Sequence, residues 1–281
     1  MDAPRTSTVE AGAVALGARC WPGGTGRPVL LVHGLSSNAR LWDGVGGALA
    51  AAGHPVVAVD LRGHATSAGV PDPPDGPGAT RAAAADLAAV CAGLGWRRPV
   101  IAGQSWGGNV VLQLAADEPG LVHALALVDG GWLHLGDRFA DLDAAWDVLA
   151  PPRFDGVTLA EVREHLRGAH PDWSRVAVDA SVGNLRERPD GTVAPWLDRD
   201  RHRAIVASLL AHRPRELYPA VRCRCLLLAA TAQDDPRGVR PLLDEALALL
   251  PRGELVEFPG GDHDLHAQHP DRVAALIGGL A

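Results

Sequence analysis

Five residues, Gly103-Gln104-Ser105-Trp106-Gly107, constrain the fold of this chain more than any others. They follow the apolar run 99–102 and precede a stretch, 109–116, whose composition is typical of a helix. A serine flanked by glycines at a strand-to-helix turn is typical of a nucleophile elbow, which holds the hydroxyl clear of the backbone. The helix N-terminus beside it favours a developing negative charge. We therefore expect Ser105 to be a nucleophile; the alternative is a glycine-rich turn with an incidental serine.

Short apolar runs alternate with helical patterns along most of the chain. Apolar runs without polar alternation, such as 28–33, indicate strands that are buried on both faces of a parallel sheet. The fold class predicted is therefore α/β, with a mostly parallel, doubly wound sheet. Strands are expected at 14–21 (antiparallel to a segment around Val9), 28–33, 56–59, 99–102, 124–128, 225–230 and 254–258. Helices are expected at 41–52, 80–93, 109–116, 239–250 and from the last strand to residue 281.

The alternation stops after Trp132 and resumes near residue 220. We predict a core made of residues 1–132 and 220–281, with a helical cap, 133–219, inserted after the strand that ends at Asp129. A capping box, Thr158 to Glu161, opens one helix of this cap. Ligands of doubly wound sheets bind beyond the carboxyl ends of the strands. The cap is therefore expected to cover the active site, the alternative being a decorative insertion.

Three tryptophans in and near the cap are candidates for contact with a substrate: Trp132, Trp146 and Trp173. Aromatic side chains of this kind favour an apolar acyl or aryl group as ligand. They are equally often part of a hydrophobic core. The sequence leaves both interpretations open.

A serine hydroxyl becomes a strong nucleophile only when a base takes its proton and an acid orients that base. His263 is the best candidate base, because it lies in the loop between the last predicted strand and the last helix. Asp235 is favoured as the acid because it follows the strand 225–230. Asp129 and Asp234 remain alternatives, since Asp129 also ends a parallel strand.

Two backbone N–H groups are expected to form an oxyanion hole. His33-Gly34-Leu35 follows the first parallel strand, where a glycine allows the backbone to approach the reacting carbon. The N–H of Leu35 would act together with the N–H of Trp106. Such donors stabilise the negative charge that develops on a carbonyl oxygen under attack.

Composition excludes several classes of function. The net charge of −7 argues against binding to nucleic acid. All 26 basic residues are arginine, so Schiff-base and pyridoxal chemistry are excluded. No dinucleotide fingerprint or phosphate-binding loop occurs, and the spacing of His263, His266 and His269 is a loose metal pattern, so neither cofactor nor metal is expected. Without a signal-peptide pattern or a long apolar run, we expect a cytoplasmic monomer or homodimer that binds a small-molecule substrate and no membrane.

The motifs occur in an order that resembles the α/β-hydrolase-fold superfamily, in its serine-nucleophile branch of esterases, lipases and thioesterases. They are His33-Gly34, Asp60-x-Arg62-Gly63-His64-x-x-Ser67, Gly103-x-Ser105-x-Gly107, the loop with Asp234 and Asp235, and Gly261-x-His263. The resemblance covers about residues 8 to 281. It implies the α/β-hydrolase fold and a Ser-acid-His triad. The stretch 230–233 is longer than the usual turn before the acid, which keeps Asp129 open.

The expected function is that of a serine hydrolase that cleaves an ester, thioester or lactone of a small, mainly apolar substrate through an acyl-enzyme. Because a fold does not fix chemistry, the same triad could also serve C–C bond hydrolysis, a lyase reaction, acyl transfer or cyclisation. The Ser-Trp pair at the elbow is similar to that of proline iminopeptidases, which adds aminopeptidase chemistry. A ligand-binding protein with little turnover is the alternative outside catalysis.

Overall fold

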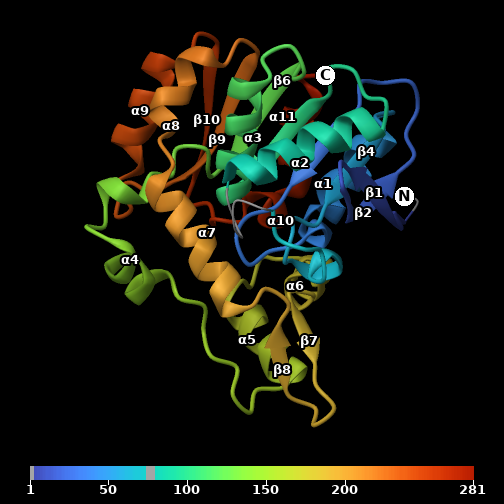
Figure 1. Cartoon of the computed structure of the whole chain (residues 1–281), viewed down its shortest axis with the longest axis vertical. Helices are drawn as coiled ribbons and strands as arrows, with labels where there is room; N and C mark the ends of the chain where they lie inside the picture. The colour runs from blue at the N-terminus through green and yellow to red at the C-terminus, as the bar shows by residue number, and fades with distance from the viewer. Residues whose placement is uncertain (1–2, 74–79) are drawn as a thin grey trace.

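Eight strands form one sheet in the order β1-β2-β4-β3-β5-β6-β9-β10 in the computed structural model, which describes residues 3–73 and 80–281 (Figure 1). β2 pairs antiparallel with β1 and with β4, and the other neighbours pair in parallel. The predicted α/β class and the doubly wound, mostly parallel sheet are thus confirmed. The strands are β1 Arg5–Ala11, β2 Val14–Trp21, β3 Val29–Val32, β4 Val56–Val59, β5 Val100–Gln104, β6 Ala124–Val128, β9 Arg224–Thr231 and β10 Gly253–Pro259.

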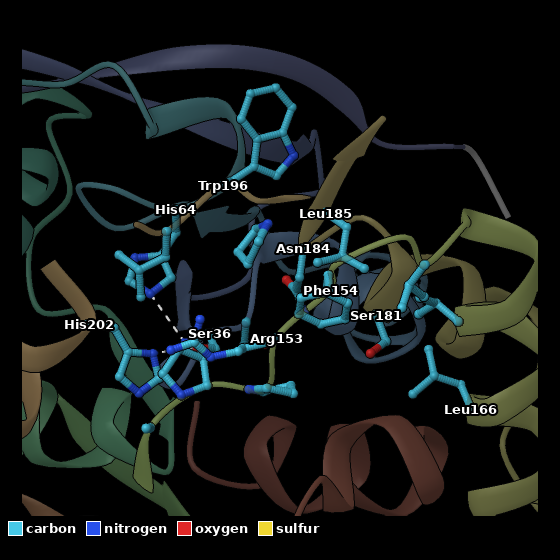
Figure 2. Close-up of a pocket in the computed structure, with 18 of the residues that line it drawn as sticks. Ser36, His64, Arg153, Phe154, Leu166, Ser181, Asn184, Leu185, Trp196 and His202 are labelled. Carbon is cyan, nitrogen blue, oxygen red and sulfur yellow. Dashed lines mark hydrogen bonds between the residues drawn. The ribbon is translucent and has the colours of Figure 1, made fainter. Parts of the chain in front are cut away.

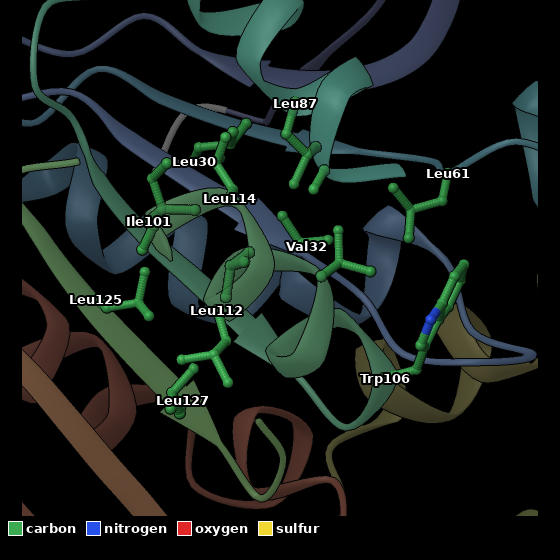
Figure 3. Packing of buried hydrophobic residues seen from close by; sticks show 14 of the residues in the cluster. Leu30, Val32, Leu61, Leu87, Ile101, Trp106, Leu112, Leu114, Leu125 and Leu127 are labelled. Carbon is green, nitrogen blue, oxygen red and sulfur yellow. The ribbon is translucent and has the colours of Figure 1, made fainter. Parts of the chain in front are cut away.

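The central strands β3 to β6 are buried on both faces, because helices cover each side of the sheet and successive side chains of a strand point to opposite sides. In β3, Leu30 and Val32 join one hydrophobic cluster, while Val29 and Leu31 join another. The first cluster is covered by α2 (Thr80–Gly93), α3 (Trp106–Asp117) and α9 (Val239–Leu249), and the second by α1 (Asp43–Ala51) and α11 (Pro270–Gly278). Figure 3 shows the first cluster, in which leucines of the strands and of α3 meet between the layers. This arrangement explains why the strands read as continuous apolar runs.

Two predicted helices are each divided in two. The helix expected at 41–52 is a 3-10 turn, η1 (Ala39–Trp42), followed by α1, and the turn begins where the Asn38 side chain accepts a hydrogen bond from the N–H of Arg40. The final helix is divided into α10 (Leu265–Gln268) and α11. Pro270 causes this break, because proline lacks an N–H and is favoured at the first position of a new helix.

Residues 133–219, which we call the insertion, lie between β6 and β9 in the chain, and most of them lie at one end of the sheet, whereas their last helix lies beside α9 (Figure 1). The predicted capping box of Thr158 and Glu161 is present at the start of α5. The Asn38 side chain, beyond the carboxyl end of β3, donates to the carbonyl of Ala180 in the insertion at 2.8 Å. The main elements are α4 Leu142–Leu149, α5 Leu159–Ala169, α6 Arg175–Val182, β7 Leu185–Glu187, β8 Val193–Pro195, α7 Arg199–Ala211 and α8 Pro214–Leu217.

The described residues contain no helix with both the length and the hydropathy needed to cross a membrane.

Packing of α3 against the sheet predicts a large loss of stability when one of its leucines is shortened. Leu112 is fully buried, so Leu112→Ala should lower the free energy of unfolding by about 3 kcal/mol. Leu249, at the end of α9, is 38% exposed, and Leu249→Ala should change it by less than about 0.5 kcal/mol. Urea unfolding curves of both variants test this. Equal losses would mean that α3 is not packed as described.

Candidate active site

Ser105 lies at the turn between β5 and α3 in a backbone conformation that residues other than glycine rarely adopt. Its φ is 54° and its ψ is −124°. Such a conformation costs on the order of 1–3 kcal/mol and persists only when its surroundings hold it. Here the Ser105 N–H donates to the carbonyl of Val128 at 3.0 Å, and a Cβ at Gly107 would lie 2.4 Å from the carbonyl oxygen of His33. The turn therefore has the strained geometry of a nucleophile elbow.

The turn after β3 lies directly against this elbow. A Cβ at Gly34 would lie 2.8 Å from the Cβ of Ser105, so only glycine allows the approach. The N–H of Leu35 donates to no acceptor among the residues that the structure describes. Trp106 begins α3, and the first N–H groups of a helix have no partner inside it. The N–H groups of Leu35 and Trp106 thus have no acceptor among the described residues, and they belong to the two turns that meet at Ser105.

Three histidines hold the turn after β3 in place. His33 is fully buried; its Nδ1 donates to the carbonyl of Gly34 at 2.7 Å and its Nε2 accepts from the N–H of Leu61 at 3.0 Å. Burial lowers the pKa of His33 to about 4, so the ring stays neutral. His64 Nε2 accepts from the N–H of Ser36 at 3.3 Å.

The third histidine, His202, comes from α7 of the insertion. Its Nε2–H donates to the carbonyl of Leu149 at 3.0 Å, which leaves Nδ1 to accept the hydroxyl hydrogen of Ser36, also at 3.0 Å. This contact joins the insertion to the residue that follows Leu35.

His263 lies in the loop between β10 and α10, where the sequence places it, and its carboxylate partner is Asp129. The His263 Nδ1 is 2.6 Å from Asp129 Oδ2. Gln104, inside the serine motif, donates from Nε2 to the carbonyl of His263 at 3.2 Å. The loop of the histidine is therefore attached to the elbow itself, through a residue to which sequence reasoning gave no role.

Asp129 follows β6, with φ of 41°, and its side chain is only 2% exposed. Oδ1 accepts from the N–H of Ala230 at 3.0 Å, and Oδ2 accepts from Arg237 Nη1 at 2.7 Å as well as from His263. Burial raises the pKa of Asp129, but hydrogen bonds from His263 and Arg237 outweigh burial and lower it overall. The carboxylate is therefore ionised at neutral pH.

Asp235, which the sequence favoured as the acid, does not reach His263. Its carboxylate accepts from the N–H of Val239 at 2.7 Å and of Arg240 at 3.0 Å, so it caps the start of α9. Asp234 is exposed in the same loop. Asp129, the alternative from the end of β6, is the acid that the structure brings to the histidine. The preference for Asp235 is corrected accordingly, because its two oxygens are occupied by the helix end.

The pKa of His263 is raised above its ordinary value of 6.5. Burial lowers it, but the hydrogen bond to Asp129 and the charges of Asp264 and Asp129 outweigh both burial and the opposing charge of Arg237. With Nδ1 held by the carboxylate, Nε2 is the nitrogen left to exchange a proton with a reactant.

The neighbouring histidines pack against aromatic rings. The ring of His266 lies 4.3 Å from that of Trp42, and the ring of His269 lies 5.6 Å from that of Phe258. Within the described ranges, no group of three or more His, Cys, Asp or Glu side chains is arranged to hold a metal ion.

A pocket of about 840 Å³ opens between the turn after β3 and the insertion (Figure 2). Ser36, Ser37 and His64 form its wall on the side of the sheet. Its other walls are mainly apolar and come from the insertion, with Val148, Leu149, Phe154, Val157, Val162, Leu166, Leu185 and Trp196 among them. α5 contains no buried residue, because its apolar side faces this space. The space next to Ser36, the residue that follows Leu35, is therefore mainly apolar.

The tryptophans expected to contact a substrate lie outside this pocket. Trp132 is buried in the core below α3. Trp146 packs edge-on against His202, and Trp173 stacks on His170 at 4.0 Å. Their rings are occupied by packing, and the indole that lines the pocket is that of Trp196.

The sequence matches the model of the alpha/beta hydrolase family over residues 29–276. It is 34% identical to lipase LipV of Mycobacterium tuberculosis over 266 residues, 92% of this chain and 94% of that protein. It is 37% identical to esterase Rv0045c of the same species over 126 residues, which are 45% of this chain and only 39% of the esterase.

A similar fold occurs in the crystal structure of E-2-(acetamidomethylene)succinate hydrolase, with a TM-score of 0.77, 21% identity, and 99% of this chain and 98% of that one covered. The match to the family model takes in the strands from β3 onward, the serine motif and the histidine loop described above. The chain therefore belongs to the alpha/beta hydrolase family.

Proposed function

We propose that the protein is a serine hydrolase that cleaves carboxylic esters of small, mainly apolar substrates through an acyl-enzyme. One observation carries the proposal: Ser105 lies on a strained elbow whose Gln104 donates to the carbonyl of His263, and the Nδ1 of this histidine is held 2.6 Å from the buried carboxylate of Asp129. This is the arrangement that activates a hydroxyl for attack on a carbonyl. The relatives named as an esterase and a lipase support the choice of an ester.

In the first half of the proposed reaction, Ser105 Oγ attacks the ester carbonyl carbon while His263 Nε2 takes the hydroxyl proton. The carbonyl oxygen becomes an oxyanion, to which the N–H groups of Leu35 and Trp106 donate. His263 then gives its proton to the leaving alcohol as the C–O bond breaks. Asp129 keeps the proton on Nδ1 of the imidazole and stabilises the charged ring throughout.

Water repeats these steps on the acyl-enzyme. His263 Nε2 takes a proton from water, the hydroxide attacks the acyl carbon, and Ser105 leaves with the proton returned by His263. Thioesters and lactones present the same carbonyl and could enter the same steps. We propose that the insertion acts as a cap over this site, because its apolar residues enclose the 840 Å³ pocket beside the oxyanion turn.

Removal of the nucleophile should abolish turnover without unfolding the protein. We expect Ser105→Ala to lower kcat for p-nitrophenyl esters by roughly 10⁴-fold or more, and to lose labelling by a fluorophosphonate. Ser7→Ala, on the exposed strand β1, serves as the matched control and should behave as wild type. Mass spectrometry locates the adduct. Full ester turnover by Ser105→Ala would rule out Ser105 as the nucleophile.

Exchange of the two candidate acids should distinguish them. Asp129→Asn places an amide N–H donor against His263 Nδ1, so the imidazole adopts the wrong tautomer and kcat should fall by roughly 10⁴-fold. Asp235→Asn keeps an oxygen at the end of α9 and should change kcat by no more than about threefold. Steady-state kinetics on the same ester measure both. A large loss in Asp235→Asn together with an active Asp129→Asn would assign the acid to the loop after β9.

The pH dependence follows from the state of His263. Attack requires the neutral imidazole, and the pKa of this ring is raised above 6.5. Activity should therefore be present at high pH and fall as the pH drops through a midpoint above 6.5. Because the pKa of Asp129 is lowered, its carboxylate stays charged across this range. A profile of kcat/KM on a non-ionising ester checks the midpoint, and a midpoint well below 6.5 would contradict the assignment of His263 as base.

A further inference from the structure

A cation occupies the strand end from which the acid was expected. Arg237 lies in the loop between β9 and α9, two residues after Asp235. Its Nη1 donates to Asp129 Oδ2 at 2.7 Å, and its Nη2 donates to Asp129 Oδ1 at 3.3 Å and to the carbonyl of Ala230. The guanidinium thus contacts both oxygens of the carboxylate and the backbone beside it, which is the geometry that arginine provides and lysine does not.

The turn that carries Arg237 is closed by its own hydrogen bonds. The N–H of Asp235 donates to the carbonyl of Ala232 at 3.2 Å, and the N–H of Gly238 donates to the carbonyl of Asp235 at 2.9 Å. The Asp235 carboxylate also caps α9, through Val239 and Arg240. The Arg237 side chain is 41% exposed. Its backbone is nevertheless held on this capped turn, and its guanidinium donates to three acceptor oxygens.

Arg237 and His263 share one oxygen atom. Oδ2 of Asp129 accepts from His263 Nδ1 at 2.6 Å and from Arg237 Nη1 at 2.7 Å. A carboxylate held by two donors on one oxygen cannot rotate away from the imidazole. It also delivers less negative charge to the ring than a carboxylate that pairs with the ring alone.

His263 has an acidic environment apart from this arginine. Its charged and titratable neighbours come from five parts of the chain: Asp129 after β6, Arg237 after β9, Asp262 and Asp264 in its own loop, His266 in α10, and His170 of the insertion, which pairs with Asp262 at 2.5 Å. Asp129 and Asp264 favour the protonated ring, and Arg237 opposes it. A base that is protonated at neutral pH cannot accept the proton of a serine.

We propose that Arg237 is a positioning residue of the hydrolysis, which fixes the Asp129 carboxylate toward His263 and offsets part of the negative charge that this carboxylate presents to the imidazole. The inference rests on the proposed function. The loop after β9, which was expected to supply the acid, supplies instead an arginine that positions the acid. Removal of the Arg237 charge should leave Asp129 in contact with His263 but shift His263 toward its protonated form.

Three variants test the proposal by kcat/KM on a non-ionising ester as a function of pH. Arg237→Met should lower the high-pH plateau of kcat/KM roughly tenfold, since the carboxylate loses its fixed orientation. It should also move the acid limb, the pH range in which kcat/KM falls toward low pH, to higher pH, since a positive charge that opposes protonation of His263 is lost. Arg237→Lys should keep the limb near its wild-type position with an intermediate plateau. Arg240→Met, which removes an exposed arginine paired with Glu257, should match wild type. An acid limb of Arg237→Met at or below the wild-type position overturns the proposal.

A second measurement does not depend on turnover. The chain has 12 histidines, and the NMR signal of His263 is identified by its absence in His263→Asn. Its titration midpoint should be higher in Arg237→Met than in wild type and unchanged in Arg240→Met; no rise overturns the proposal. If wild type cleaves no ester, the proposed function fails while this titration still decides the role of Arg237. Should Arg237→Met unfold on heating below assay temperature, Arg237→Gln, which keeps donors without the charge, gives the same comparison.

Discussion

The ionised carboxylate of Asp129 is buried among hydrophobic strands, and its hydrogen-bond donors are what make that burial tolerable. A buried charge without partners would cost several kcal/mol. Here a backbone N–H, an imidazole and a guanidinium surround it. The donors come from the ends of different strands, so one side chain draws together β6, β9 and the loop after β10. The hydrogen bonds accepted by Asp129 therefore orient His263 and also hold the loops after β6, β9 and β10 together.

Much of the fold could be predicted from the sequence, because a sheet covered on both faces leaves a plain signal. Runs such as Val29–Val32 and Val56–Val59 contain only apolar residues, and each matches an observed strand. Helix ends were harder to predict. The division between α10 and α11 depends on Pro270, whereas the start of η1 depends on a side-chain contact of Asn38 that spacing alone does not reveal.

The candidate site was predictable where a motif carries its own local geometry. Ser105 is placed by a strand, a turn and a helix that are contiguous in sequence, and His263 by the last strand and helix. The acid was not, because β6 and β9 end at the same edge of the sheet and either could supply it. The two aspartates differ in the location of their hydrogen-bond donors. Those of Asp235 are in the helix that follows it, whereas Asp129 accepts from His263 in the loop after β10.

Contacts between distant segments left no signal in the sequence. Arg237 is 108 residues from Asp129, and Gln104 is 159 residues from His263. Neither position belongs to a pattern that indicates a partner. The tryptophans were predicted to contact a substrate because aromatic residues often line ligand pockets. Trp132 and Trp173 are instead buried and fill space in the hydrophobic core. The pocket lining includes Val162 and Leu166 of α5, aliphatic residues that ordinary helical periodicity would assign to packing.

The contact between Ser36 and His202 has a mechanical consequence. It attaches α7 to the residue next to Leu35, whose N–H faces the reacting oxygen in the proposed mechanism. A displacement of α7 away from the sheet must therefore break this bond or carry the turn after β3 with it. If the bond breaks, His33 and His64 still hold the turn; if it persists, widening of the pocket on this side moves the Leu35 N–H. The opening of the pocket by α7 would then be coupled to the position of the Leu35 N–H, through the single hydrogen bond between Ser36 and His202.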